Sequence, residues 1–304
     1  MKNITILNKL WALFFDKSDH FINKEIIIKA IAIFCFINVL MIVPDITFLY
    51  GSKSIIQESV NNQHIRAYQP IFNWFSNPLS IIGIPKDVTI IFFILIYIAS
   101  FVGLFFNKYR FISSIIAWFI HLIIVNSNFL FTYGADNMIT VLLIFNILIC
   151  IPFKDQAKRN TTFSFAIRFL QIHMCFIYFF GGLGKALGTN WLDGNAIWYV
   201  INIYSNNYVD SAMHFINYPI VFKITCWSIV FLELLYPFLI YAPKIKKIIL
   251  IKIILLHLFI GLFMNLFTFA GVMILLNLIA FGHYLSWFKV QENYSQSVVE
   301  LNTI

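Results

Sequence analysis

Long apolar blocks, separated by short polar segments, run through this 304-residue chain. A helix needs about 20 mostly apolar residues to cross the hydrocarbon core of a bilayer. Blocks of roughly this length are Ile26–Val43, Val88–Phe106, Phe111–Leu130, Met138–Phe153, Phe163–Phe180, Ile220–Tyr241, Ile248–Phe267 and Phe269–Phe288. The sequence therefore predicts an all-α, polytopic integral membrane protein with about eight transmembrane helices.

The composition excludes a soluble globular domain. Hydrophobic residues make up 61% of the chain and charged residues only 11%, whereas soluble domains carry about 25% charged residues. The net charge of +8 does not indicate nucleic-acid binding, because the basic residues are scattered between the apolar blocks rather than gathered on one face. The expected partner is the lipid bilayer, and no nucleic acid is expected.

The last two blocks form one nearly continuous apolar stretch. At about 1.5 Å per residue this stretch is too long for one crossing. We therefore expect a tight turn near Asn265–Ala270. The choice between seven and eight spans depends on this turn.

Lysine and arginine predict the orientation of the chain, because cytosolic segments of membrane proteins are enriched in both. With a cytosolic N-terminus, most of the 21 basic residues fall in or beside inner segments. The exceptions are Lys53, Arg66, Lys86, Lys185 and Lys223. The N-terminus is therefore predicted to be cytosolic, and an integral protein of a bacterial plasma membrane is the expected localisation.

A single transmembrane domain is expected over residues 1–304. Leu7, Leu10, Trp11 and Phe14 recur at helical spacing, which predicts an interfacial helix within residues 1–25. Residues 289–304 are expected to form a short tail. The two long outer loops, Thr47–Asp87 and Gly181–Pro219, direct the search for function to the outer face.

The fifth block carries a polar stripe. Its members share one helical face because they are spaced by three or four residues, and they are Arg168, Gln171, Cys175, Tyr178 and Gly182. Two interpretations stay open. The stripe either forms a hydrogen-bonded seam between helices or lines a substrate pocket through Arg168, Gln171 and Tyr178.

Lys185 follows this stripe in a glycine-rich run whose spacing does not fit a phosphate-binding loop. A lysine held among glycines and apolar groups could act as a neutral base. Alternatively, it snorkels to the lipid headgroups. If it is catalytic, Asp136 or Asp193 is its expected counter-ion, although Asp136 could also simply cap a helix.

Other titratable groups have simpler interpretations. Glu233 could serve in a proton path, but pairing with Arg168 is the simpler interpretation, since both fall toward the predicted inner side. The histidines His121, His173 and His257 lie near the middle of their predicted spans and are expected to make hydrogen bonds between helices. No His or Cys spacing matches a metal motif, so no metal site is predicted.

The segment Tyr178-Phe-Phe-Gly-Gly-Leu-Gly-Lys185, followed by Trp191-Leu-Asp-Gly194, resembles the horizontally transferred transmembrane (HTTM) domain. That domain also forms the membrane part of vitamin K-dependent gamma-carboxylases. Arg168 and Gln171, the Tyr133–Asn137 loop and the pattern from His257 to Met273 add to the resemblance. In form the chain is most similar to sporulation-delaying protein B-like membrane proteins of bacteria.

The resemblance implies an outward-facing pocket in which Lys185 is the catalytic base. Asp136 and Asp193 would assist it, and substrate would contact Arg168, Gln171, Tyr178, Trp191 and His257. The cofactor implied is a quinone. Where the carboxylases carry a histidine motif this chain reads Asp136-Asn137, and it has no room for their lumenal domain, so carboxylation of glutamate is not expected.

The function predicted is maturation or modification of a secreted peptide, together with accessory maturation proteins. Two alternatives stay open. One is a quinone-dependent membrane oxidoreductase or carboxylase-like enzyme, and the other is a non-enzymatic transporter or immunity-type membrane protein.

Overall fold

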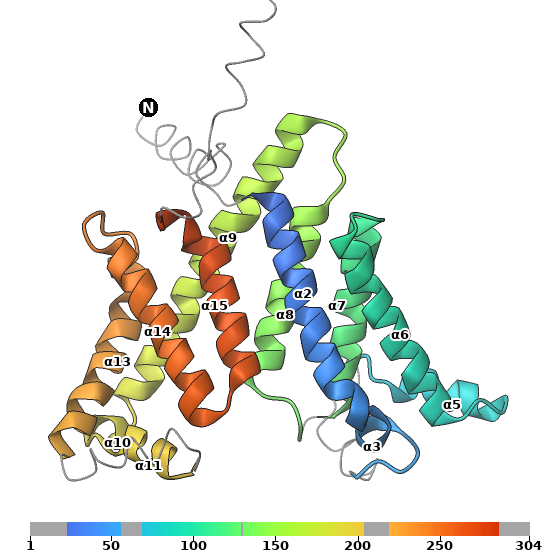
Figure 1. The fold of residues 1–304 in the computed structure, drawn as a ribbon, viewed down its shortest axis with the longest axis horizontal. Coiled ribbons are helices and arrows are strands. Elements are labelled where there is room, and N and C mark those ends of the chain that lie inside the picture. Colours follow the sequence, from blue (N-terminus) through green and yellow to red (C-terminus); the bar gives the residue numbers. More distant parts are fainter. Residues whose placement is uncertain (1–22, 56–68, 129, 204–218, 286–304) are drawn as a thin grey trace, which may run out of the picture. The chain divides into compact units, whose positions relative to one another are not determined.

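The computed structural model describes residues 23–55, 69–128, 130–203 and 219–285. These residues form helices joined by turns and contain no strand (Figure 1). The all-α class is therefore confirmed. The predicted interfacial helix within residues 1–25 falls almost wholly outside the described residues, and the predicted tail at 289–304 does so entirely.

The long helices match the eight predicted blocks in order. They are α2 (Lys24–Ile42), α6 (Lys86–Phe105), α7 (Arg110–Ser127), α8 (Gly134–Cys150), α9 (Gln156–Ala186), α13 (Pro219–Leu239), α14 (Lys246–Met264) and α15 (Phe267–Phe281). Shorter elements lie between them or extend them, namely η1 (Val43–Asp45), α3 (Ile46–Tyr50), α5 (Asn73–Ile81), α10 (Thr189–Leu192), α11 (Asn195–Ile203) and η3 (Gly282–Tyr284).

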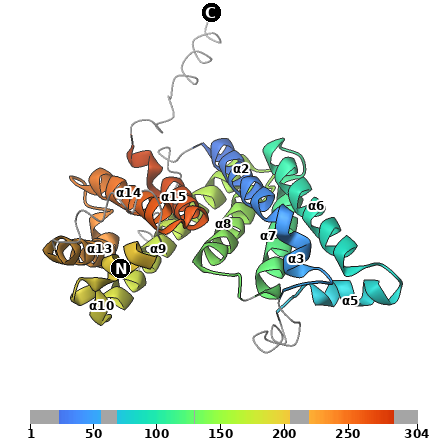
Figure 2. The ribbon, with the colours of Figure 1, turned by 60° about the horizontal axis from the view of Figure 1, so that its bottom comes forward.

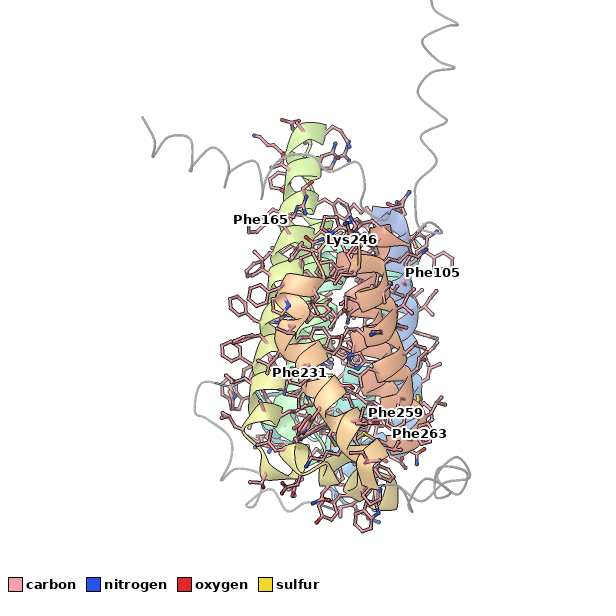
Figure 3. All side chains as sticks on the ribbon, turned by 90° about the vertical axis from the view of Figure 1, so that its left-hand side faces the viewer. Phe105, Phe165, Phe231, Lys246, Phe259 and Phe263 are labelled. Atoms are coloured by element: carbon pink, nitrogen blue, oxygen red, sulfur yellow. The ribbon has the colours of Figure 1, made fainter. Side chains whose placement is uncertain are left out.

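Seven of these helical segments are long and apolar enough to cross a membrane. The shorter α8 has 17 residues, at the lower end of the range for a spanning helix. The helices also carry apolar side chains on their exposed faces; Phe231 of α13 is 58% exposed, and Phe259 stacks on Phe263 along α14 (Figure 3). Such faces suit contact with lipid, and the chain is a multi-pass integral membrane protein.

The turn between α14 and α15 lies where the sequence predicts it. Two residues, Asn265 and Leu266, separate the helices. Asn265 has a φ of +54°, a left-handed conformation that asparagine tolerates better than most residues. The prediction of two separate helices is confirmed.

The described chain groups into two compact units. Unit 2 comprises Ile28–Ala166 and His257–Leu275. In it α6, α7 and α8 lie side by side (Figures 1 and 2). The buried Asn146 of α8 donates a hydrogen bond to Ser114 of α7 at 3.1 Å, which joins these helices by a polar contact in an apolar core.

Unit 1 comprises Ile167–Leu256 with the flanking segments up to Ile27 and from Leu276. Here α10 and α11 lie against α13 (Figure 1). The predicted outer loop Gly181–Pro219 is therefore partly helical, and its described part packs on a membrane-spanning helix. Residues 204–218 of that loop fall outside the described residues.

Candidate functional site

Lys185 lies in the last turn of α9 and forms an ion pair with α13. Its Nζ atom is 2.5 Å from Oε2 of Glu233. The Glu233 side chain is only 8% exposed, whereas that of Lys185 is 26% exposed. The carboxylate is thus buried, while the amine keeps one side open.

The pair lies well inside the span of α13. Glu233 falls in the second half of this helix, about 20 Å along it from Pro219 at roughly 1.5 Å per residue. A lysine that snorkels would instead reach the helix end and the headgroups. The structure therefore favours a paired lysine over a snorkelling one.

Two glycines allow the chain to approach α13 this closely. A Cβ atom on Gly182 would lie 2.6 Å from the backbone nitrogen of Leu234. A Cβ atom on Gly194 would lie 2.6 Å from Cα of Lys223, and Gly194 also has a φ of +87°. The glycine-rich run thus positions the ion pair, because any larger residue at either glycine would separate the backbones.

Trp191 of α10 covers the amine. The Lys185 Nζ atom lies 5.4 Å from the centre of the Trp191 ring, within the range of a cation–π contact. The neighbouring residue is fixed to α13, since Nε1 of Trp227 donates to the carbonyl of Leu192 at 2.9 Å. Lys185, Trp191 and Glu233 therefore form one cluster, the lysine–glutamate site.

The expected counter-ions of Lys185 need correction. The carboxylate that pairs with it belongs to Glu233, which sequence analysis assigned to Arg168. Asp193 is exposed after α10, and Asp136 belongs to unit 2. The assignment failed because it assumed that Lys185 lies at the outer interface, above the depth of Glu233.

The polar stripe of α9 forms a hydrogen-bonded seam in unit 1. Gln171 donates to the carbonyl of Ala280 at 2.7 Å. The amide of Asn277 donates to the Tyr178 hydroxyl at 2.6 Å and accepts from the Tyr236 hydroxyl at 2.9 Å. These contacts join α9, α13 and α15, as the first interpretation of the stripe predicted.

Arg168 lies at the far end of this stripe from the lysine–glutamate site. It donates to Gln171 at 3.3 Å. Along α9 it is about 25 Å from Lys185, at roughly 1.5 Å per residue. Arg168 and Gln171 therefore cannot share one small pocket with Lys185, and their predicted role in binding the same substrate as Lys185 has no geometric support.

Asp136 and His257 belong to unit 2. His257 is buried, and its ring meets that of Phe269 edge-on at 5.8 Å between centres. Asp136 lies in the first turn of α8, where its Oδ2 accepts from the backbone N–H of Tyr133 at 2.9 Å. Asp136 therefore caps α8 as the third helical residue of a capping box, whereas the N-cap position itself is occupied by Tyr133.

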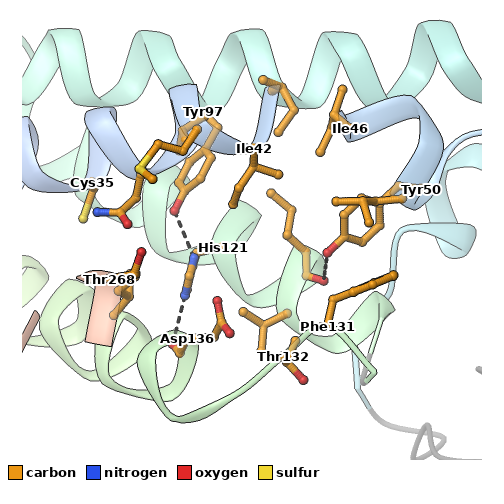
Figure 4. Close-up of a pocket in the computed structure, with 18 of the residues that line it drawn as sticks. Cys35, Ile42, Ile46, Tyr50, Tyr97, His121, Phe131, Thr132, Asp136 and Thr268 are labelled. Carbon is orange, nitrogen blue, oxygen red and sulfur yellow. Dashed lines mark hydrogen bonds between the residues drawn. The ribbon is translucent and has the colours of Figure 1, made fainter. Parts of the chain in front are cut away.

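Asp136 also lines a cavity of about 320 Å³ in unit 2 (Figure 4). None of Lys185, Arg168, Gln171, Tyr178 and Trp191 lines it.

Sequence analysis missed Glu233 as the partner of Lys185 and Asn277 as the centre of the seam. A signal for Asn277 was present, since a carboxamide in the middle of an apolar span needs a partner.

Comparison of the chain with protein-family models, with curated proteins and with solved structures found no match. The resemblance to the HTTM domain thus depends only on the residues quoted above.

Proposed function

We propose that this membrane protein assists the maturation or modification of a secreted peptide, and that the lysine–glutamate site carries the chemistry. One observation carries the proposal, namely the 2.5 Å ion pair between Lys185 and Glu233 inside a membrane span. Ionisable groups at this depth are costly and are retained mostly where they act on a substrate, an ion or a proton.

The pair suits proton transfer. A carboxylate at hydrogen-bond distance can take the proton of the ammonium group and leave a neutral amine as a general base. The amine is reachable, because the Lys185 side chain is 26% exposed. A peptide backbone or a small acidic group could approach along this open side.

The resemblance of Tyr178–Lys185 and Trp191–Gly194 to the HTTM domain supports a role for Lys185 as base. The distribution of basic residues supports a site that is reached from outside the cell, where secreted peptides are processed.

The test is mass spectrometry of secreted peptides from the native host with and without this gene, and with Lys185→Ala in its place. We expect one or more peptides to lose a modification or cleavage in the deletion and in Lys185→Ala alike. Lys223→Ala is the matched control, because Nζ of Lys223 also lies 5.4 Å from an indole ring, that of Trp227. Identical peptide profiles with and without the gene would refute the proposal.

A quinone-dependent oxidoreductase or carboxylase-like enzyme is the second candidate, favoured by the indole of Trp191 beside the amine. A planar ring could stack there, and the hydroquinone form would supply an acidic hydroxyl for Lys185 to deprotonate. Quinone in lipid extracts of the wild-type protein, present in smaller amount in extracts of Trp191→Ala, would support this candidate.

If Lys185→Ala leaves the peptide profile untouched, the transporter or immunity-type function is the better interpretation.

Access from outside can be tested by cysteine labelling of intact cells. Ile82 lies exposed in the predicted outer connection between α5 and α6, and Lys108 lies exposed in the predicted inner turn between α6 and α7. A membrane-impermeant maleimide should label Ile82→Cys and spare Lys108→Cys until the cells are opened. The reverse pattern would invert the orientation and place the proposed chemistry in the cytosol.

A further inference from the structure

The cavity of unit 2 has a polar end and an apolar wall. Its polar groups come from Asp136 of α8, His121 of α7 and Tyr97 of α6 (Figure 4). Val39, Ile42 and Ile46 are among the apolar residues of its wall. At about 320 Å³ the cavity lies at the lower end of the range for small-molecule sites.

His121 fixes the polar end without contributing a charge. Its Nε2 atom lies 3.0 Å from the backbone oxygen of Asp136, which can only accept, so Nε2 must carry a proton. Its Nδ1 atom lies 3.0 Å from the Tyr97 hydroxyl. Burial favours the neutral form of the ring. Its Nδ1 atom then accepts a hydrogen bond from the Tyr97 hydroxyl, and both ring nitrogens are satisfied.

The first turn of α8 is held from several sides. The carbonyl of Asp136 accepts from His121 and also from the Thr140 hydroxyl at 2.9 Å. The preceding Tyr133 hydrogen-bonds to Thr268, and burial raises the pKa of its phenol. The Asp136 side chain is thus presented to the cavity by a rigid backbone.

Asp136 gives the cavity its charge. No lysine or arginine is among the residues that line it, and Asp136 is its one acidic residue. Within the described chain, the one hydrogen bond found to the carboxylate comes from Tyr133. An ionised carboxylate has about four acceptor positions, so the group can bind a cationic donor and still cap α8.

We propose that this cavity is a second site, separate from the lysine–glutamate site, which binds a small amphiphile with a primary ammonium head group. The ammonium group donates to the Asp136 carboxylate, and the apolar body lies along Val39, Ile42 and Ile46. A carboxylate head group is excluded by repulsion from Asp136. An alcohol binds more weakly than the amine, because it lacks the positive charge.

The probes are decylamine, decanol and decanoate, which share a chain length and differ in the head group. The full-length protein is reconstituted in phosphatidylcholine nanodiscs, and binding is followed by the thermal unfolding midpoint as each probe is titrated. For the wild type we expect decylamine to act at a concentration at least about tenfold lower than decanol, with no stabilisation by decanoate.

Asp136→Asn separates charge from capping, since the amide oxygen of asparagine can still accept from Tyr133. We expect this variant to bind decylamine and decanol equally. Asp87→Asn is the matched control. Asp87 is a first-turn acid of α6 in the same unit that accepts from the Ser52 backbone at 2.8 Å, but it does not line the cavity.

Ile42→Trp provides a variant that keeps Asp136. Ile42 lines the cavity and is part-exposed, so the larger ring can enter the cavity without overpacking a closed core. Binding of both the amine and the alcohol should be lost. Unchanged decylamine binding in both Asp136→Asn and Ile42→Trp would overturn the proposal, as would a preference of the wild type for decanoate.

An alkylammonium group can come from a free amine or from the ethanolamine head of a phospholipid. Adding phosphatidylethanolamine to the nanodiscs distinguishes the two sources. If the lipid occupies the site, decylamine will bind more weakly in these discs to the wild type but not to Asp136→Asn. If the natural ligand is a free amine, the lipid will leave decylamine binding unchanged.

Discussion

In unit 1 an amine and a carboxylate face each other between α9 and α13, whereas in unit 2 a phenol, an imidazole and a peptide carbonyl form a chain without net charge between α6, α7 and α8. The ion pair lies on two helices long enough to cross a membrane, and the hydrogen-bonded chain lies on two more, α6 and α7, and on the shorter apolar α8. The neutral chain satisfies each of its groups and costs little to bury. Burying the ion pair costs the desolvation free energy of two charges, and the attraction between the charges seldom exceeds this cost.

We interpret the hydrogen-bonded chain of unit 2 as structural support and the ion pair of unit 1 as the place of the proposed chemistry. Tyr97, His121 and Asp136 hold three helices in register and fix one wall of a cavity. Lys185 and Glu233 could be replaced by apolar residues with little loss of stability, so selection for stability alone does not explain them. The predictions below test this contrast.

The largest effect is expected when one partner of the ion pair is removed. Lys185→Met leaves the buried Glu233 carboxylate without its cation and should destabilise the protein by about 3 kcal/mol. Glu233→Gln should cost less, because the amine of Lys185 is part-exposed and can reach water. Unfolding in a graded series of SDS–detergent mixtures measures both.

The double variant Lys185→Met with Glu233→Met provides the control. We expect stability close to that of the wild type, or above it, together with complete loss of the proposed peptide processing. If the double variant were as unstable as Lys185→Met alone, the pair would be structural and the contrast between the units would disappear.

A smaller loss is expected at His121. His121→Leu removes both hydrogen bonds of the ring and leaves the buried Tyr97 hydroxyl without its acceptor, at a cost of about 2 kcal/mol. Tyr97→Phe should cost about 1 kcal/mol, because the Nε2 bond to Asp136 survives. Neither change should affect peptide processing, and a loss of processing at unchanged protein levels would show that the two units act together.

Gly182 tests how closely α9 must approach α13. Gly182→Ala places a Cβ atom 2.6 Å from a backbone nitrogen, and overpacking of this kind costs about 1–3 kcal/mol. Gly184→Ala is its matched control on the same helix, where the added atom meets nothing within 4 Å. Since alanine favours helix over glycine by about 1 kcal/mol, Gly184→Ala should be neutral or slightly stabilising in the same assay.

The spans and the α14–α15 turn could be predicted because they depend on local properties. The hydropathy of one segment is enough to predict that it forms a membrane helix, and Asn265 indicates the turn. The ion pair could not be predicted in this way. Lys185 and Glu233 are 48 residues apart in the sequence. Their contact depends on where α9 ends along the length of α13, and the residue pattern of one helix alone cannot predict this.

The predicted span Phe163–Phe180 also understated α9, which runs from Gln156 to Ala186. The apolar block ends where polar residues begin, but helical hydrogen bonding continues through these polar residues.

The cavity of unit 2 could not be predicted from the sequence for a similar reason. Cys35, Asp136 and Thr268 line it from three helices that are far apart in the sequence, so no motif spacing could indicate it.

The smallest effect is expected at Lys223. Like Lys185 it lies over an indole ring, but within the described residues no carboxylate pairs with it. Both amines lie 5.4 Å from an indole centre. A cation–π contact at a part-exposed position contributes about 0.5–1 kcal/mol, so Lys223→Met should cost no more than this. The difference between Lys223→Met and Lys185→Met then isolates the buried carboxylate of Glu233. Equal losses in the two variants would mean that the tryptophan contact, rather than the ion pair, governs the stability of this end of α9.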